Sequence, residues 1–197
     1  MFVNYLNFDN FSAKNEEISM PTWPLKTRQS TLPTTNTPGS FWEDRKDRRH
    51  CGIDLYAEQG ADVMAIESGK VIATGIMTAP EFIHYWNVTH YVIIKNQDGT
   101  FWKYGEMEEI FVKKGELITE GQLLGQVGLV LNSSKINEDS PLYIQKLKHK
   151  NPSMLHLELF SSNPIAEHKK YLGGNWFEKQ RPKNLLDPAI KLQKINQ

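Results

Sequence analysis

The sequence predicts an all-β fold, and three features of the chain indicate this. From about Gly52 to Val130, short runs rich in valine, isoleucine and aromatic residues alternate with turns that carry glycine, as antiparallel strands do. No helical period fits the stretch 112–127, where glycine recurs every few residues. Apolar and polar side chains alternate along Met154–Leu159, as expected of a strand with one buried face.

Residues 1–40 are predicted to form an N-terminal arm and an extended segment. Aromatic and polar residues alternate at its start, and proline, threonine and serine dominate from Met20 to Gly39, which favours extended or looped chain. Residues 41–160 are predicted to form the β-core, and residues 161–197 a basic C-terminal extension.

Two hairpins are predicted within the core. The first joins Val63–Ile66 to Lys70–Ala73, and the second joins Tyr91–Lys95 to Thr100–Tyr104. In each pair a glycine-bearing turn of a few residues separates two β-rich runs, which is the usual signal of a hairpin.

The polar stretch 131–153 predicts a long loop with a short helix from Pro141 to Lys148. Loops of this length are usually either functional or disordered. After the strand Leu155–Phe160, Asp187 is placed to cap a last short helix, Ala189–Leu192.

The composition excludes several classes of protein and of site. A chain of 197 residues has the length of one domain with one hydrophobic core. Its 23 Lys and Arg residues balance its 23 Asp and Glu residues, which argues against nucleic acid as the main partner. No apolar run approaches the roughly 18 residues of a membrane span, so no membrane insertion is expected. The single cysteine, Cys51, leaves histidine and carboxylate as the only ligands for a metal ion.

The N-terminus is not expected to be a signal peptide. It has no Lys or Arg ahead of its apolar residues, and asparagines interrupt them, whereas a signal peptide needs a basic start and an unbroken apolar stretch. We therefore expect the protein to be cytoplasmic or to be exported by a route that reads no such signal.

His50 and Asp54 are the first candidates for a metal site. On a straight strand they would share a face but lie about 13 Å apart, too far for one metal ion. Gly52 lies between them and would let the backbone bend. Alternatively, His50 ends the basic surface run Arg45–Arg49 and Asp54 opens a turn, and these residues taken alone favour that interpretation.

His156 is the next candidate, because alternation sends Leu155, Leu157 and Leu159 to the core and leaves Met154, His156 and Glu158 on the other face. A single histidine there could equally be a surface or hydrogen-bonded residue. Two histidines and one carboxylate, with water in the fourth position, are the usual make-up of a hydrolytic zinc site.

These segments form a pattern that runs in order from Trp23 to Phe160. Its parts are Trp23-Pro24-Leu25, His50-x-Gly52-x-Asp54, Gly60–Ala65 with Gly69-Lys70-Val71, Tyr104, Val112–Gly115 with Gly121–Gly128, and Leu155–Glu158. The pattern resembles the lysostaphin/LytM-like zinc peptidases. The resemblance implies a β-sandwich-like core of the duplicated hybrid motif and a groove that holds one zinc ion. It implies His50, Asp54 and His156 as the ligands, and hydrolysis of peptide bonds in peptidoglycan stems or cross-bridges.

The chain departs from the family pattern at two positions. Glu106 follows Tyr104-Gly105 where the family usually has a histidine, and Met154 stands where the first histidine of a His-x-His pair is usual. A thioether cannot accept a proton at neutral pH, but a glutamate beside zinc can act as a general base, so we assign that role to Glu106. His90 or His149 could replace a missing histidine, although either is more readily a surface residue. Cys51 is expected to be a small buried hydrophobe outside the site.

Two functions stay open from the sequence. One is a zinc metallopeptidase that acts on cell-wall peptides, which the three ligands favour. The other is a catalytically inactive, metal-binding relative that serves as a cell-wall or protein-binding module, which the two departures favour. A lipoyl- or biotinyl-type carrier is excluded, because the required lysine at a tight hairpin tip is absent.

Overall fold

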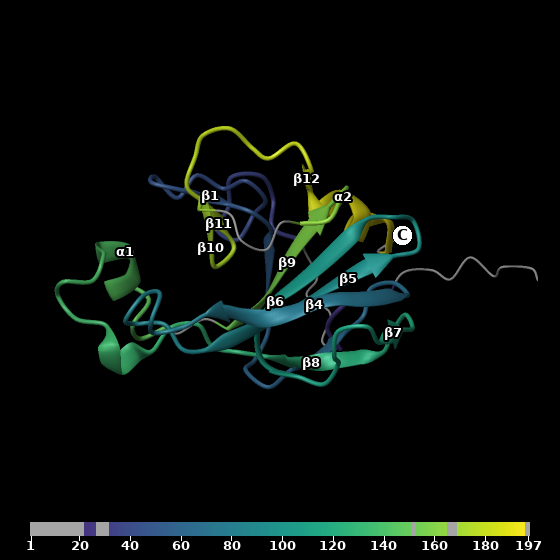
Figure 1. Cartoon of the computed structure of the whole chain (residues 1–197). Helices are drawn as coiled ribbons and strands as arrows, with labels where there is room; N and C mark the ends of the chain where they lie inside the picture. The colour runs from purple at the N-terminus through teal and green to yellow at the C-terminus, as the bar shows by residue number, and fades with distance from the viewer. Residues whose placement is uncertain (1–21, 27–31, 151–152, 165–168, 196–197) are drawn as a thin grey trace, which may run out of the picture.

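The computed structural model describes residues 22–26, 32–150, 153–164 and 169–195, and the described chain is mostly β, as predicted (Figure 1). The strands are β1 Arg49–His50, β2 Ile53–Tyr56, β3 Asp62–Met64, β4 Gly69–Thr78, β5 Thr89–Asn96, β6 Phe101–Ile110, β7 Leu117–Ile118, β8 Leu123–Val127, β9 Met154–Phe160, β10 Tyr171–Leu172, β11 Asn175–Trp176 and β12 Leu185–Leu186. The helices are α1 Leu142–Gln145 and α2 Pro188–Leu192, with 3-10 turns at Ser133–Lys135 and Gln193–Ile195.

The strands form a large sheet and a small one, and their pairings are antiparallel. The large sheet runs in the order β12-β9-β6-β5-β4-β7, while β2 pairs with β9 and β8 pairs with β3 and β6. The small sheet has the order β1-β11-β10 and lies above the large sheet in Figure 1. It joins the start of the core to the C-terminal part of the chain.

One predicted hairpin is confirmed and the other is wrong. β5 and β6 pair around the turn at 97–100, as expected. β3 does not pair with β4, however, but with β8. The backbone of Ala65 explains this, because its N–H donates to the carbonyl of Gln122 and its carbonyl accepts from the N–H of Gly121. The distant segment therefore takes the hydrogen bonds that a local hairpin would have used.

The C-terminal part contains more structure than the sequence pattern indicates. Strands β10, β11 and β12 each have two residues, too few to leave a periodic signal. The last helix, α2, forms where expected, and the carboxylate of Asp187 caps it by accepting from the N–H of Ala189. In the long loop, α1 covers only the first half of the predicted helix.

The main hydrophobic core lies on one face of the large sheet. Leu155, Leu157 and Leu159 belong to it, as the alternation predicts. His156 and Glu158 are buried on the opposite face, where Tyr171 of β10 donates to Glu158 and Gly174 lies against the ring of His156. The face of the large sheet that bears His156 and Glu158 is therefore covered by the C-terminal segment. No helix of the described residues is long and apolar enough to cross a membrane.

Candidate metal centre

His50, Asp54 and His156 come together from three strands. His50 ends β1 of the small sheet, while Asp54 and His156 are register partners on β2 and β9 of the large sheet. Gly52 lies where the chain passes from one sheet to the other. A Cβ atom on residue 52 would lie 2.1 Å from the carbonyl oxygen of Leu157, so glycine is needed here for close approach to β9. The backbone bend expected at Gly52, between His50 and Asp54, is thus present.

One atom of each residue points to a common centre. His50 Nε2 lies 3.0 Å from His156 Nδ1 and 3.1 Å from Asp54 Oδ1, and the last two atoms are 2.9 Å apart. Ligands about 2.0 Å from a zinc ion in tetrahedral geometry are about 3.3 Å apart. The three atoms therefore form a triangle of the size of one face of a zinc tetrahedron.

The tautomer of each histidine is set by the hydrogen bond that its other ring nitrogen makes, on the side away from the centre. His50 Nδ1 lies 2.8 Å from the carbonyl oxygen of Ser40, so it must donate its proton there. His156 Nε2 lies 3.1 Å from Glu158 Oε1 and donates to it in the same way. In the neutral imidazoles, both nitrogens at the centre are therefore acceptors, and Asp54 adds a third.

Three acceptors at this spacing need a positive charge between them. A proton can join only two of the atoms, whereas a metal ion binds all three. The three side chains are buried, so water does not solvate their acceptor atoms. Leaving these atoms without a positive charge would therefore cost free energy. The donor set, two imidazoles and a carboxylate, is the set that suits zinc.

The charged neighbours of Asp54 leave one of its oxygens for the centre. Arg45 donates to Asp54 Oδ2 over 3.1 Å, and the same guanidinium contacts Glu43 Oε2 and Asn175 Oδ1. Burial alone would raise the pKa of the Asp54 carboxyl, but the two histidines beside it hold that pKa well below its usual range. The carboxyl group of Asp54 is therefore ionised at neutral pH.

The two histidines differ in their pKa. Burial lowers the pKa of His50, so its imidazole is neutral at pH 7. Burial acts in the same direction on His156, but hydrogen bonds to Asp54 and Glu158 raise its pKa to about 9. The metal-free centre therefore attracts one proton to His156, which a metal ion would displace.

Glu158 connects this centre to a second group of buried polar residues. Its Oε1 accepts from Lys103 Nζ over 3.2 Å and from the hydroxyl of Tyr171, and Lys103 also contacts that hydroxyl. Burial opposes ionisation of Glu158, but the ammonium group of Lys103 and the bond from His156 lower its pKa to about 2. A fixed carboxylate thus orients the ring of His156.

Glu106 lies near the centre without belonging to the three converging groups. Its backbone has a φ of 60°, in the left-handed region that residues other than glycine rarely adopt. The register between β5 and β6 shifts at this point, which marks a β-bulge. Burial and the negative charge of Asp54 raise the pKa of Glu106 to about 7.

The other candidates lie outside the centre. His90 contacts the backbone carbonyl of Glu108 through Nδ1, and His149 is exposed. Cys51 is buried, and burial and the charge of Glu158 raise the pKa of its thiol. Met154 is partly exposed at the start of β9.

A family model for peptidase family M23 matches residues 48–159, which is more than half of the chain. This chain belongs to peptidase family M23. The matched region contains the three converging residues and Glu106. A comparison with curated proteins found no match.

Solved structures of several peptidases resemble this chain at low identity. A peptidase M23 from Pseudomonas aeruginosa is 19% identical with a TM-score of 0.47, and the match covers 88% of this chain and 50% of that one. A zinc-containing peptidase from Vibrio cholerae is 22% identical with a TM-score of 0.44, covering 70% and 35%. The catalytic domain of lysostaphin from Staphylococcus simulans is 17% identical with a TM-score of 0.44, covering 87% and 90%. The chain thus spans half the length of the Pseudomonas aeruginosa protein.

Sequence reasoning missed the residues of this M23 chain that hold the ligands in place. Arg45 appeared only as part of a basic run, and Tyr171 lies in the C-terminal extension. Glu158 did leave a signal, since it shares the polar face of its strand with His156. Their roles depend on contacts between distant segments, which no local pattern reports.

Proposed function

We propose that this M23 protein is a zinc-dependent endopeptidase that hydrolyses peptide bonds, with peptidoglycan stem or cross-bridge peptides as its substrates. The observation that carries the proposal is the convergence of three buried acceptors, His50 Nε2, Asp54 Oδ1 and His156 Nδ1, on one point. Membership of the peptidase family supports a peptide substrate.

The centre is suited to bind one zinc ion through His50, Asp54 and His156. A zinc ion bound by three protein ligands polarises a carbonyl group and lowers the pKa of water to about 7. The protein contributes rigid ligand positions, because Ser40 and Glu158 orient the two rings and Arg45 anchors the carboxylate. These contacts keep the ligands in place before the substrate arrives.

Glu106 is proposed as the general base that takes the proton from the attacking water. Its raised pKa, about 7, suits proton transfer near neutral pH. Its left-handed backbone also supports the role, because strained residues persist mainly where function requires them. Tyr104 and Met107 on the same strand are fully buried in the hydrophobic core, and the bulge between them turns the side chain of Glu106 away from that core.

An inactive, metal-binding relative is the second candidate. Met154 favours it, because its thioether offers neither a base nor a strong hydrogen-bond donor on the face of β9 that bears His156. Such a protein would keep zinc as a structural element and bind cell wall or another protein. It would bind zinc and cleave nothing.

The test combines metal analysis with digestion of muropeptides followed by mass spectrometry. One zinc ion per chain and new peptide ends would support the peptidase. Zinc without cleavage of any wall preparation would favour the inactive relative. His50→Ala should lose the zinc, and His149→Ala, which alters an exposed histidine, should keep it. If the unaltered protein bound no zinc, both functions would be wrong.

A further inference from the structure

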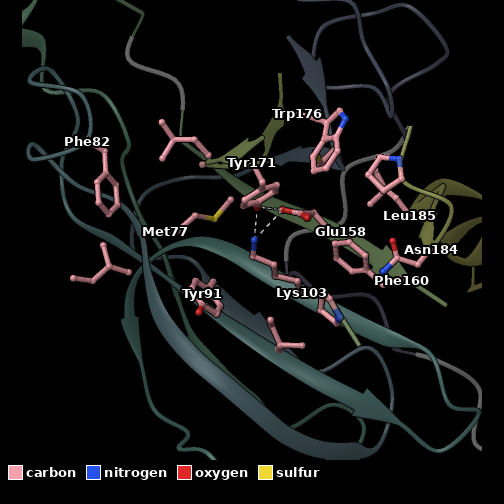
Figure 2. Close-up of a pocket in the computed structure, with 17 residues that line it drawn as sticks. Met77, Phe82, Tyr91, Lys103, Glu158, Phe160, Tyr171, Trp176, Asn184 and Leu185 are labelled. Carbon is pink, nitrogen blue, oxygen red and sulfur yellow. Dashed lines mark hydrogen bonds and ion pairs between the residues drawn. The ribbon is translucent and has the colours of Figure 1, made fainter. Parts of the chain in front are cut away.

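A cavity of about 350 Å³ lies over the large sheet (Figure 2), and Glu158 of β9, which accepts a hydrogen bond from His156, is part of its lining. This volume is at the lower end of the range of about 300–1,000 Å³ that is typical of ligand pockets. Its walls are largely apolar, and they include the aromatic residues Phe82, Tyr91, Phe160, Tyr171 and Trp176. The cavity has the size and lining of a pocket for one bulky apolar group.

The C-terminal segment forms one wall of the cavity. Tyr171, Trp176 and Leu185 line it, and all three lie beyond residue 159, where the match to the family ends. The segment is held down close to the centre, because the N–H of Cys51 donates to the carbonyl of Gly174 over 2.8 Å. The enclosure is therefore built by this chain's own C-terminal part.

The polar groups in the cavity leave one acceptor without a partner. Glu158 Oε1 accepts from Lys103, Tyr171 and His156, whereas its Oε2 atom is buried and has no hydrogen-bond partner among the described residues. Figure 2 shows the carboxylate of Glu158 directed into the cavity beside Lys103 and Tyr171. A buried carboxylate oxygen without a partner calls for a donor from a bound molecule.

The charges in the cavity select an uncharged molecule. Lys103 and Glu158 form a buried ion pair, so their charges already balance. An ammonium group would be repelled by Lys103, and a carboxylate by Glu158. A neutral N–H group avoids both penalties and satisfies the free oxygen.

We propose that this cavity is a specificity pocket for one uncharged, apolar residue of a peptide, with an amide N–H of that residue donating to Glu158 Oε2. Because Glu158 also accepts from His156, the pocket lies one hydrogen bond from the metal centre. The bound residue is therefore adjacent to the bond that is cut, a conclusion that rests on the proposed peptidase function.

The binding step can be measured without any cleavage. The probe is N-acetyl-L-phenylalaninamide, titrated by NMR into the full chain, first without metal and then with zinc. We expect saturable shifts of residues around the cavity in both forms. The lysine and glutamate analogues of the probe should bind more than about tenfold more weakly. No saturable binding, or equal binding of the lysine analogue, would overturn the proposal.

Two phenylalanines provide a matched pair of variants. Phe82 lines the cavity and Phe111 does not, yet each residue is 50% exposed. Phe82→Ala should weaken probe binding by about tenfold, because apolar contact area is lost. Phe111→Ala should leave it unchanged. Equal weakening by both variants would mean that the probe binds elsewhere.

Cleavage separates failure of the pocket from failure of the peptidase. A mixture of peptides digested by the zinc-loaded protein should be cut next to uncharged apolar residues, with Phe82→Ala reducing that preference. Cleavage without this preference would overturn the pocket and leave the peptidase standing. Probe binding without any cleavage would overturn the peptidase, and with it the role of the pocket in substrate choice.

Discussion

His156 and Glu158 stand two residues apart on β9, and the Nε2–H of the histidine donates to Oε1 of the glutamate over 3.1 Å. Because side chains two apart on a strand share a face, this pair is set by the strand itself. The bond leaves Nδ1 of His156 directed at Asp54 and His50. The orientation of one proposed ligand is therefore controlled by a buried carboxylate that Lys103 and Tyr171 also hold.

Glu158→Gln tests this control. The amide oxygen can still accept from His156, but the negative charge that polarises the ring is lost. We expect zinc affinity to fall by about 10–100-fold, as for other residues that orient metal ligands. Competition with a fluorescent chelator measures this, and circular dichroism checks folding. Glu109→Gln, which alters an exposed glutamate of β6, is the control and should bind zinc normally. Equal affinities for the two variants would contradict the role of Glu158.

The pH dependence of zinc binding follows from His156. Hydrogen bonds to Asp54 and Glu158 outweigh burial and raise the pKa of His156 to about 9, so the metal-free protein carries this proton at pH 7. Zinc must displace it, so affinity should rise by about tenfold per unit from pH 7 to 9 and then level off. Calorimetry in two buffers of different ionisation enthalpy should detect release of about one proton at pH 7. Zinc affinity that stayed constant between pH 7 and 9 would show that His156 is not protonated in the free centre.

The same pKa shift affects folding of the metal-free protein. A histidine whose pKa is raised in the folded state stabilises the fold below its unfolded pKa of about 6.5, and this contribution is lost as the pH rises through about 9.

Glu106→Gln tests the proposed base. The amide cannot accept the proton, so kcat should fall by about 10²–10⁴-fold while zinc content stays at one ion per chain. In the unaltered protein, activity should fall as the pH drops below the pKa of Glu106. Burial and Asp54 raise that pKa to about 7 without metal, and the positive charge of zinc would lower it. Turnover that survives the substitution would assign the base to another group.

Gly52→Ala tests the crossing between the two sheets. Its Cβ would lie 2.1 Å from the carbonyl oxygen of Leu157, so β2 and β9 must separate. We expect the free energy of unfolding to fall by about 1–3 kcal/mol and zinc affinity to fall with it, measured by urea denaturation and chelator competition. At Gly99 an added Cβ meets nothing within 4 Å. Gly99→Ala should cost only the left-handed strain, about 1 kcal/mol, and should keep zinc affinity.

Several features could be predicted from the sequence because they depend on neighbours along the chain. The alternation at 154–159 correctly divided core leucines from the face that carries His156. The turn between β5 and β6 and the helix capped by Asp187 were also predicted correctly. The first hairpin was wrong because Ala65 found its backbone partners in a segment more than fifty residues away.

By itself, the sequence determined the β character of the chain and the ligand types that a metal ion could use. It also indicated the glycine at which His50 and Asp54 could be brought together. Only the tertiary structure decided that His50, Asp54 and His156 meet with their lone pairs converging, that a bulge turns Glu106 out of the strand alternation, and that the C-terminal segment encloses a pocket over Lys103 and Glu158. The physical reason is that alternation assigns a side chain to a face, whereas hydrogen bonds between distant strands decide which faces meet and which atoms point at one another.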